Sequence, residues 1–220
     1  MSIQTPIFET ITLQTAKGLK IVADVFGAAD LPTVIMLHGG GQTRHSWHAT
    51  VPKLAAAGFR VMAVDSRGHG DSDWSADGDY TTPAQAEDLL AILDIAGPRA
   101  ALVGASMGGL AGFYAIGRYR PPSVRALVLV DIVISPAREG VERIRQFMRA
   151  HANGFETVDA AAAAVAAYYP ERARPAGPAG LMRNLRQREG RLYWHWDPRL
   201  LSSSAENDLR RSTEWLCRSE

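Results

Sequence analysis

Residues 100–119 read AALVGASMGGLAGFYAIGRY, and this stretch decides the fold. AALV predicts a strand and LAGFYAIGRY predicts a helix. Between them, GASMG (104–108) fits the pattern G-x-S-x-G in the strand–turn–helix context that the pattern requires. A turn this sharp strains the backbone of Ser106 and needs small neighbours, which Gly104 and Gly108 supply. The sequence therefore predicts that the Ser106 hydroxyl projects over the carboxyl end of a strand, as a candidate nucleophile.

Two backbone N–H groups near Ser106 are candidates to bind a developing oxyanion. Met107 follows Ser106 at the start of the predicted helix, where the helix dipole favours negative charge. HGGGQ (38–42) follows an apolar run, and its glycines let the backbone approach a substrate oxygen with no side chain in the way. We take Gly40 as the second donor. Gly41, beside it, is a candidate substrate contact and the next choice of donor.

Strand and helix patterns alternate on both sides of this stretch. Strands are predicted over 7–13 and 19–26 (a hairpin around Gly18), 33–37, 59–64, 100–103 and 124–134, and helices over 46–57, 82–95 and 110–119. The alternation from residue 33 onwards is typical of βαβ units, so we predict an α/β fold with a mostly parallel sheet and helices on both faces. The run 124–134 is the most apolar, which predicts a strand buried on both faces.

The sequence changes character after Pro136. Helices are predicted over 138–152, 157–169 and near 180–188, and no strand pattern follows to the end of the chain. An all-helical block appended to a parallel sheet indicates a cap or lid. We therefore expect an α/β core over residues 1–136, a helical cap over residues 137–205 and an irregular charged tail over residues 206–220.

Composition and charge narrow the class of protein. The 220 residues carry a net charge of +1, which gives no basic field for nucleic acid. Cys217 is the single cysteine, so no disulfide forms within the chain, and its charged surroundings carry no catalytic motif. The first residues lack the pattern of a signal peptide, and no apolar run is long enough to span a membrane. We expect a cytoplasmic protein that acts on a small molecule, without nucleic-acid or membrane partners.

Four motifs occur in one order: HGGGQTRHSW (38–47), DSRGHGDSD (65–73), GASMGG (104–109) and VLVDI (128–132). In this arrangement the chain resembles the α/β-hydrolase superfamily, in its branch of cofactor-free haloperoxidases, esterases and C–C hydrolases. The resemblance implies strand order 1-2-4-3-5-6, a serine nucleophile, ester or related acyl substrates, and no metal, haem or other cofactor. Ser106 at the elbow argues against dehalogenase and epoxide-hydrolase chemistry, for which the superfamily uses a carboxylate there.

The resemblance also implies groups that are missing from the sequence. The superfamily orders its triad as Ser, then an acid after strand seven or sometimes six, then His after strand eight. Neither strand seven nor strand eight is recognisable, which suggests a chain truncated at its C-terminus or read in a shifted frame. Asp131 ends the sixth strand and is either the acid or a structural residue. His151 and His195 follow Ser106, but both fall in the predicted cap, so a catalytic base is lacking and activity is expected to be impaired.

Several other residues have two possible roles. Arg67, His69 and Asp71 are expected to brace the sheet edge, and His45 and His48 to be structural or to line the entrance. Trp194, in the aromatic segment YWHWDP (193–198), is either the wall of an apolar pocket or a packing anchor of the cap.

Three functional hypotheses follow from these features. The first is an ester or acyl hydrolase impaired by the absence of a base. The second is a catalytically silent binding protein, and the third is a defective product with no function of its own. If strands seven and eight are absent, the sixth strand lies at an open edge through which the chain can self-associate.

Overall fold

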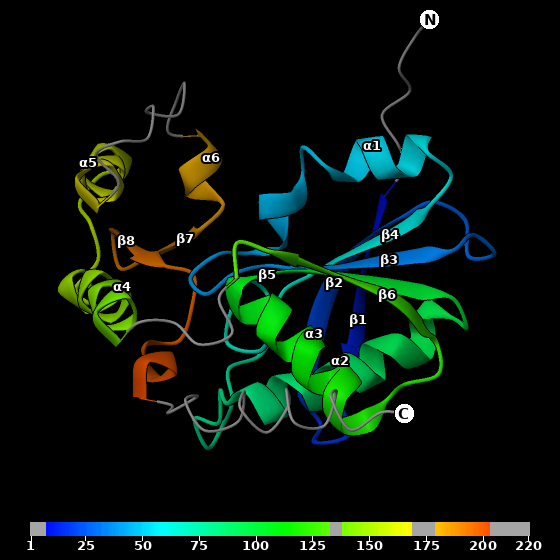
Figure 1. Ribbon diagram of the computed structural model, residues 1–220. Helices are drawn as coiled ribbons and strands as arrows, with labels where there is room; N and C mark the ends of the chain where they lie inside the picture. The colour runs from blue at the N-terminus through cyan, green and yellow to red at the C-terminus, as the bar shows by residue number, and fades with distance from the viewer. Residues whose placement is uncertain (1–7, 133–137, 169–178, 203–220) are drawn as a thin grey trace, which may run out of the picture.

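The computed structural model describes residues 8–132, 138–168 and 179–202 (Figure 1). Its centre is a six-stranded sheet in the order β1-β2-β4-β3-β5-β6, which is the order that the sequence motifs imply. The strands are β1 (Phe8–Gln14), β2 (Lys20–Phe26), β3 (Thr33–Leu37), β4 (Arg60–Val64), β5 (Ala100–Ala105) and β6 (Val124–Val130). The predicted α/β class with a mostly parallel sheet is confirmed.

Strand β3 takes the middle of the sheet because all five of its residues, TVIML, are apolar or small enough to be buried. It runs parallel to β4 on one side and to β5 on the other. Strands β1 and β2 form the predicted antiparallel hairpin, and β2 pairs antiparallel with β4. Parallel strands that are covered on both faces have continuous apolar sequences, which is why the sequence predicts β3, β4 and β5.

Helices cover both faces of the sheet (Figure 1). The helices α2 (Thr82–Ala96) and α3 (Ser106–Tyr119) share the larger hydrophobic core with β2, β3, β4 and β5. On the opposite face, the 3₁₀ helix η1 (Arg44–Trp47) and α1 (Val51–Ala56) enclose a smaller core. Both layers hold the carboxyl ends of β3 and β5 side by side, and the two predicted site loops follow those strands.

The single helix predicted over 46–57 is wrong, because the structure has η1 and α1 with a turn between them. Pro52 has no N–H to donate to the preceding turn, so it suits the start of a helix and not its interior. In addition, the backbone N–H of Arg44 donates to Asp65 Oδ1 at 2.6 Å. This bond fixes η1 on the end of β4 independently of α1.

The segment that follows the sheet contains α4 (Arg138–Ala150), α5 (Val158–Tyr168), α6 (Ala179–Met182), β7 (Leu185–Arg188), β8 (Arg191–Trp194) and η2 (Pro198–Ser202). We call the described part of this region, 138–168 and 179–202, the appended segment. The helix predicted near 180–188 is confirmed only in its first turn, since α6 ends at Met182 and β7 and β8 then form an antiparallel hairpin. Glu189 and Gly190, both with positive φ, form its two-residue turn. The appended segment is therefore not all-helical, and the boundaries of core, cap and tail stay predictions.

The appended segment joins the sheet through backbone contacts with the loop after β4. His69 and Trp196 form an isolated antiparallel bridge. The N–H of Gly70 donates to the carbonyl of His195 at 2.9 Å, and the N–H of Asp197 donates to the carbonyl of Gly68 at 2.8 Å. This short ladder holds the aromatic segment 193–198 against the core.

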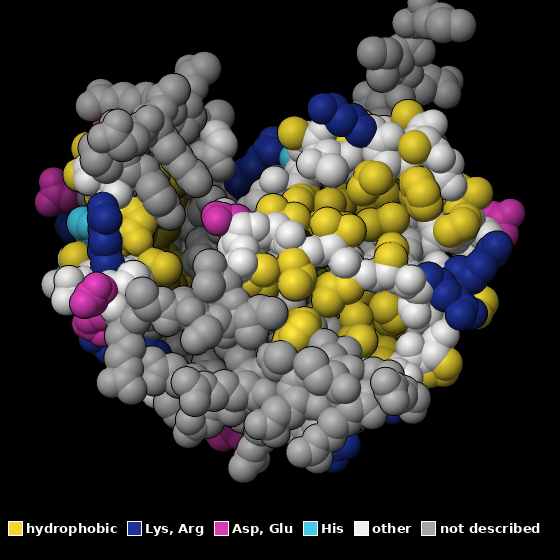
Figure 2. Space-filling view, viewed as in Figure 1, with side chains coloured by type: hydrophobic (Ala, Val, Ile, Leu, Met, Phe, Trp, Pro, Cys, Tyr) yellow, Lys and Arg dark blue, Asp and Glu magenta, His cyan; other side chains and the backbone are white. Residues whose placement is uncertain are grey.

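Strand β6 is less buried than its sequence predicted. Its only partner among the described residues is β5, so it lies at the edge of the sheet. Val128 is 50% exposed and Val130 is 36% exposed, on the strand face that α3 does not cover. Figure 2 shows hydrophobic side chains gathered over this side of the molecule. The apolar run anticipated burial on both faces, whereas the described structure covers one face only.

Some predictions lie outside the described residues. They concern the last two residues of the strand predicted over 124–134, the charged tail 206–220 and Cys217. Within the described ranges, none of the helices has the length and apolar character needed to cross a bilayer.

We expect the open edge of β6 to make the chain associate, because unpaired strand edges bind one another unless charge or cover prevents it. The double substitution Val128→Lys/Val130→Lys should lower the associated fraction measured by light scattering at micromolar concentration. The matched control is Ile95→Lys, which charges another exposed apolar residue (41% exposed), on α2. A wild-type chain that stays monomeric, or equal effects of both variants, would contradict this expectation.

Candidate active site

Ser106 is the first residue of α3 and follows directly on β5. Its φ is +43°, in the left-handed region that non-glycine residues rarely adopt, whereas Ala105 before it is extended. Such strain persists only where the surrounding structure enforces it, and it is common at functional sites. The side chain of Ser106 is exposed. The structure thus has the strained strand-to-helix junction that the sequence predicts.

The glycines around Ser106 are required by close backbone contacts. A Cβ atom on Gly104 would lie 2.4 Å from the Cα of Gly109. A Cβ atom on Gly108 would lie 2.6 Å from Leu37 Cβ and 2.7 Å from the carbonyl oxygen of His38. The N–H of Gly108 donates to that same carbonyl at 3.2 Å. The first turn of α3 is therefore pressed directly onto the end of β3.

The glycine loop 38–42 faces Ser106, because a Cβ atom on Gly39 would lie 3.6 Å from the Cβ of Ser106. The N–H of Gly39 donates to Gln42 Oε1 at 3.1 Å. The N–H of Gly41 donates to His69 Nε2 at 3.1 Å, so this donor is already used within the protein. Of the two loop donors considered from the sequence, Gly40 alone has an N–H with no hydrogen-bond partner among the described residues.

Met107, the other predicted donor, lies at the start of α3. Within the part of the chain that the structure describes, no hydrogen bond uses the N–H of Met107. A Cβ atom on Gly40 would lie 3.9 Å from Met107 Sδ, so the two residues are neighbours. The two residues predicted to form an oxyanion hole are thus neighbours, and neither N–H has an acceptor among the described residues.

Two buried histidines hold the glycine loop in place. His38 Nδ1 donates to the carbonyl of Gly39 at 2.8 Å, and His38 Nε2 accepts the N–H of Ser66 at 3.0 Å. His69 Nδ1 donates to the carbonyl of Arg67 at 3.1 Å, while its Nε2 accepts from the loop. Burial lowers the pKa of His38 to about 4, and burial with the nearby His38 lowers the pKa of His69 to about 3. Both rings are neutral near pH 7 and have both nitrogens occupied.

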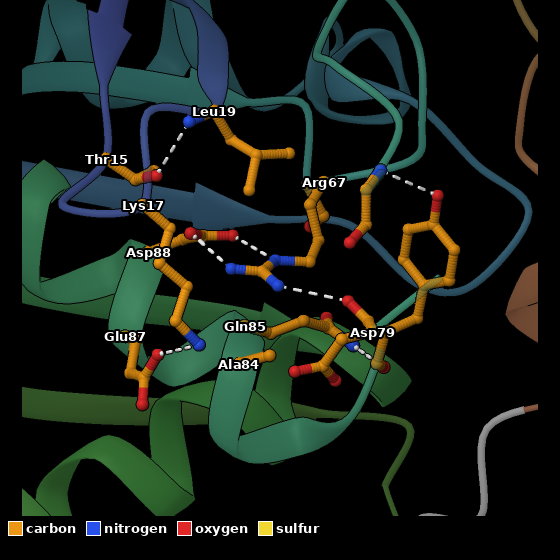
Figure 3. Close-up of polar contacts among 12 residues, drawn as sticks. Thr15, Lys17, Leu19, Arg67, Asp79, Ala84, Gln85, Glu87 and Asp88 are labelled. Carbon is orange, nitrogen blue, oxygen red and sulfur yellow. Dashed lines mark hydrogen bonds and ion pairs between the residues drawn. The ribbon is translucent and has the colours of Figure 1, made fainter. Parts of the chain in front are cut away.

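The loop after β4 braces the sheet, as predicted for Arg67, His69 and Asp71. Arg67 makes a bidentate ion pair with Asp88 of α2, with Nε–Oδ2 at 2.5 Å and Nη2–Oδ1 at 2.7 Å. Its Nη1 also donates to the carbonyl of Asp79 at 3.0 Å, and Figure 3 shows the guanidinium between these two partners. Asp71 accepts from Arg44 Nη1 at 2.8 Å, which joins the same loop to η1.

Asp131, the candidate acid, follows the last residue of β6 and has a φ of +50°. In the parallel pairing of β5 with β6, Ala105 lies opposite Val130. Ser106 and Asp131 therefore both follow the carboxyl ends of neighbouring parallel strands. The side chain of Asp131 is exposed, and no hydrogen bond among the described residues joins it to a histidine.

None of the six histidines, all of which lie in described residues, is hydrogen-bonded to Ser106. His45 Nδ1 and His48 Nε2 lie 3.2 Å apart and contact each other. His195 Nε2 lies 2.7 Å from Arg186 Nη2, and burial followed by the charge of Arg186 lowers the pKa of His195. His151 packs against aromatic rings of the appended segment. The absence of a catalytic base therefore stays a prediction from the sequence.

A cavity of about 400 Å³ lies between the appended segment and the core loops. Its walls contain three tryptophans, one tyrosine and three arginines, with no acidic residue: Trp74, Met148, Arg149, His151, Ala152, Arg186, Arg188, Tyr193, Trp194, Trp196, Pro198, Leu201 and Ser202. Trp194 lines this cavity and also packs against the small core of the appended segment, while its part in substrate binding stays a prediction. A Cβ atom on Gly41 would lie 3.6 Å from Met148 Cε and 3.8 Å from Trp196 Nε1, which brings the cavity wall to the glycine loop.

Sequence reasoning did not single out the cavity arginines or Met148. Arg186 and Arg188 lie on β7, in a stretch for which the sequence predicted a helix, and Arg149 lies in the last turn of α4. Their approach to Trp196 depends on how the hairpin packs. No local pattern in the sequence reports that packing.

Residues 32–175 match the model of a family described as the alpha/beta hydrolase fold. This chain belongs to the alpha/beta hydrolase fold family. The superfamily inferred from the four motifs is thereby confirmed.

Three relatives show the range of proteins to which this alpha/beta hydrolase is similar. Esterase Rv0045c of Mycobacterium tuberculosis is 39% identical over 112 residues, which cover 50% of this chain and 36% of that protein. Its solved structure has a TM-score of 0.75 at 28% identity, covering 96% of this chain and 72% of that one. Protein phosphatase methylesterase 1 of Mus musculus is 27% identical over 156 residues, 69% of this chain and 40% of that protein. Epoxide hydrolase 3 of Siraitia grosvenorii is 32% identical over 149 residues, 67% of this chain and 46% of that protein. The aligned part is thus less than half of each curated relative.

Gly108→Ala should destabilise the protein by about 1–3 kcal/mol, because the new methyl group would collide with the backbone at the end of β3. Urea unfolding followed by circular dichroism measures this loss. Gly140→Ala is the matched control on α4, since no atom lies within 4 Å of its would-be Cβ. Equal stability of the two variants would show that the contact between α3 and β3 is not as tight as described.

The free energy of unfolding should fall as the pH is lowered from about 6.5 towards 4. His38 and His69 stay neutral in the folded state over this range, whereas the unfolded chain takes up protons below about pH 6.5. Each unit of pKa depression corresponds to about 1.4 kcal/mol of stability present above pH 6.5 and lost on acidification. The carboxylates whose pKa is lowered, such as Asp71 and Asp197, act only at lower pH.

Urea titrations at several pH values measure this dependence. His69→Gln, whose amide can still accept from Gly41 and donate to Arg67, should flatten it. If His69→Gln follows the wild-type curve, His69 does not titrate as the burial implies.

Proposed function

We propose that this chain carries the nucleophile and the oxyanion hole of a serine hydrolase that acts on esters or related acyl compounds. Ser106 is the nucleophile, and the N–H groups of Gly40 and Met107 bind the oxyanion. The observation that carries the proposal is the strained φ of +43° at Ser106, between β5 and α3, opposite the glycine loop. Asp131 is the candidate acid, and we expect slow ester hydrolysis because no histidine among the described residues is hydrogen-bonded to Ser106.

The chemistry follows from where the charges develop. When the Ser106 oxygen attacks an acyl carbon, the carbonyl oxygen becomes an oxyanion and needs donors on one side of the tetrahedral centre. Met107 supplies an N–H at the start of a fourteen-residue helix, where the dipole favours negative charge. Gly40 supplies the second N–H from a loop without a side chain to block the approach. Removing one such donor typically costs about 3 kcal/mol of transition-state stabilisation.

Ester chemistry is favoured over epoxide opening by the residue at the elbow. Two of the relatives named above are an esterase and a methylesterase, and the third is an epoxide hydrolase. The family resemblance implies a carboxylate nucleophile for epoxide hydrolases, whereas this chain has Ser106 there. The aromatic cavity beside Gly41 can take the apolar part of a small-molecule substrate.

The expected absence of a base sets the expected rate. No histidine among the described residues is hydrogen-bonded to Ser106, and removing one member of a triad costs several powers of ten in rate. What remains is the effect of the oxyanion hole and of binding. A second candidate function follows from the same observation: a silent binding protein that keeps the cavity of about 400 Å³ without turnover.

Labelling by a fluorophosphonate probe distinguishes these functions. We expect slow covalent labelling at Ser106, located by peptide mass spectrometry, with weak or undetectable turnover of p-nitrophenyl esters. Ser106→Ala should abolish the labelling, and Ser46→Ala, at an exposed serine of η1, should retain it. No labelling of the folded chain would favour the binding protein. Ordinary esterase turnover that Ser106→Ala abolishes would mean that a base exists, and His195 would be the first residue to test.

A further inference from the structure

A cluster of three metal-ligating side chains lies away from Ser106, where η1 packs on β2. His45 belongs to η1, His48 caps its C-terminal end, and Asp24 comes from β2. One ligand atom from each residue lies within 4.8 Å of the other two. Residues three apart on a 3₁₀ helix lie on the same face, so the geometry of η1 aligns the two imidazoles.

The spacing of the two imidazole nitrogens suits a shared metal ion. His45 Nδ1 lies 3.2 Å from His48 Nε2, and the rings are 4.9 Å apart at an interplanar angle of 86°. Two histidine nitrogens on one tetrahedral zinc ion, each about 2.0–2.1 Å from the metal, lie about 3.3–3.4 Å from each other. The two nitrogens are therefore already separated as two ligands of one ion would be.

Asp24 offers an oxygen to the same point. Its side chain is buried, with 2% of the residue exposed. Its Oδ1 accepts the hydroxyl of Thr10 at 2.8 Å and lies 3.1 Å from Arg44 Nε. That Arg44 nitrogen is in poor alignment and counts as a buried donor without a hydrogen bond. No hydrogen bond among the described residues uses Asp24 Oδ2, so one oxygen of a buried carboxylate is available to a cation.

The surrounding charge also favours a cation. Arg44 is close, but it is paired with Asp65 and with Asp71 Oδ2 at 2.8 Å as well as with Asp24. Around the two uncharged imidazoles lie the three carboxylates just named and two guanidinium groups, those of Arg44 and Arg183. Their formal charges sum to −1, and a bound divalent ion would change this sum to +1.

Arg183 contacts this cluster from the appended segment. Its Nη1 lies 2.9 Å from His48 Nδ1, which must therefore accept, so that His48 Nε2 carries the proton shared with His45. A metal on His48 Nε2 moves that proton to Nδ1, which then has no lone pair for Arg183. Binding at His48 and the contact with Arg183 therefore exclude each other.

We propose that Asp24, His45 and His48 bind one divalent transition-metal ion of the zinc or cobalt class, and that binding releases Arg183 from His48. Two imidazoles and one carboxylate are a ligand set for such ions, and a fourth position remains for water. The released contact lies next to the hydroxyl of Thr43, which donates to the carbonyl of Arg183 at 3.3 Å. Metal binding is thereby linked to the contact between η1 and the appended segment.

Titration of the full-length, tag-free chain with Co²⁺, followed by its visible absorption, and with Zn²⁺, followed by calorimetry, tests the proposal. We expect one ion per chain. His45→Gln and His48→Gln should each weaken binding by at least about tenfold, as even the loss of an outer partner of a ligand can. His151→Gln is the matched control and should bind as the wild type does. Absence of binding, or binding that neither ligand variant changes, would overturn the proposal.

Two further measurements do not depend on the ligand variants. Arg183→Met removes the competitor and should tighten binding about two- to tenfold, the typical value of one hydrogen bond. X-ray absorption of the cobalt-loaded wild-type chain should show two imidazole ligands on the metal. Weaker binding by Arg183→Met, or a spectrum without imidazole, would refute the assignment even if His48→Gln failed to fold.

Discussion

The first turn of α3 packs directly against the backbone at the ends of β5 and β3, because glycines leave no side chain between them. Gly104 lies against Gly109, and Gly108 lies against Leu37 and the carbonyl of His38, at distances that no Cβ atom could share. This contact fixes the height of α3 over the sheet, and so it fixes Ser106 in the left-handed conformation. It also brings the loop after β3 within reach of the serine. The candidate site is a consequence of this one steric constraint.

Buried histidines then restrict the glycine loop 38–42, whose backbone would otherwise be flexible. A loop of consecutive glycines has a large entropy to lose, and here hydrogen bonds to His38 and His69 restrict it. Arg67 connects the loop that carries His69 to Asp88 of α2. The conformation of the loop beside Ser106 therefore depends on uncharged histidines in the interior. That use of histidine leaves both rings unable to act on the serine.

The sequence predicted the parts of the fold that depend on local pattern. Continuous apolar runs identified β3, β4 and β5, and the spacing of glycines around Ser106 identified the elbow. Three features differ from the prediction. Two have local causes: Pro52 begins a separate helix within the single helix predicted over 46–57, and Glu189 with Gly190 forms the turn of a hairpin where a helix was predicted. The third depends on distant packing, because β6 is covered on one face only among the described residues. The role of His69 was also hidden, because its partner Gly41 is 28 residues away.

The position of Asp131 has a consequence for how the candidate acid is held. It follows β6, whose hydrogen bonds to β5 are its only ladder among the described residues. Edge strands open locally at a lower free energy than the centre of a sheet, and central β5 is paired on both sides. Ser106 thus follows a strand that is paired on both sides, whereas Asp131 follows a strand that is paired on one side among the described residues. We therefore expect local opening of β6 to change the distance between the two residues more readily than opening of β5.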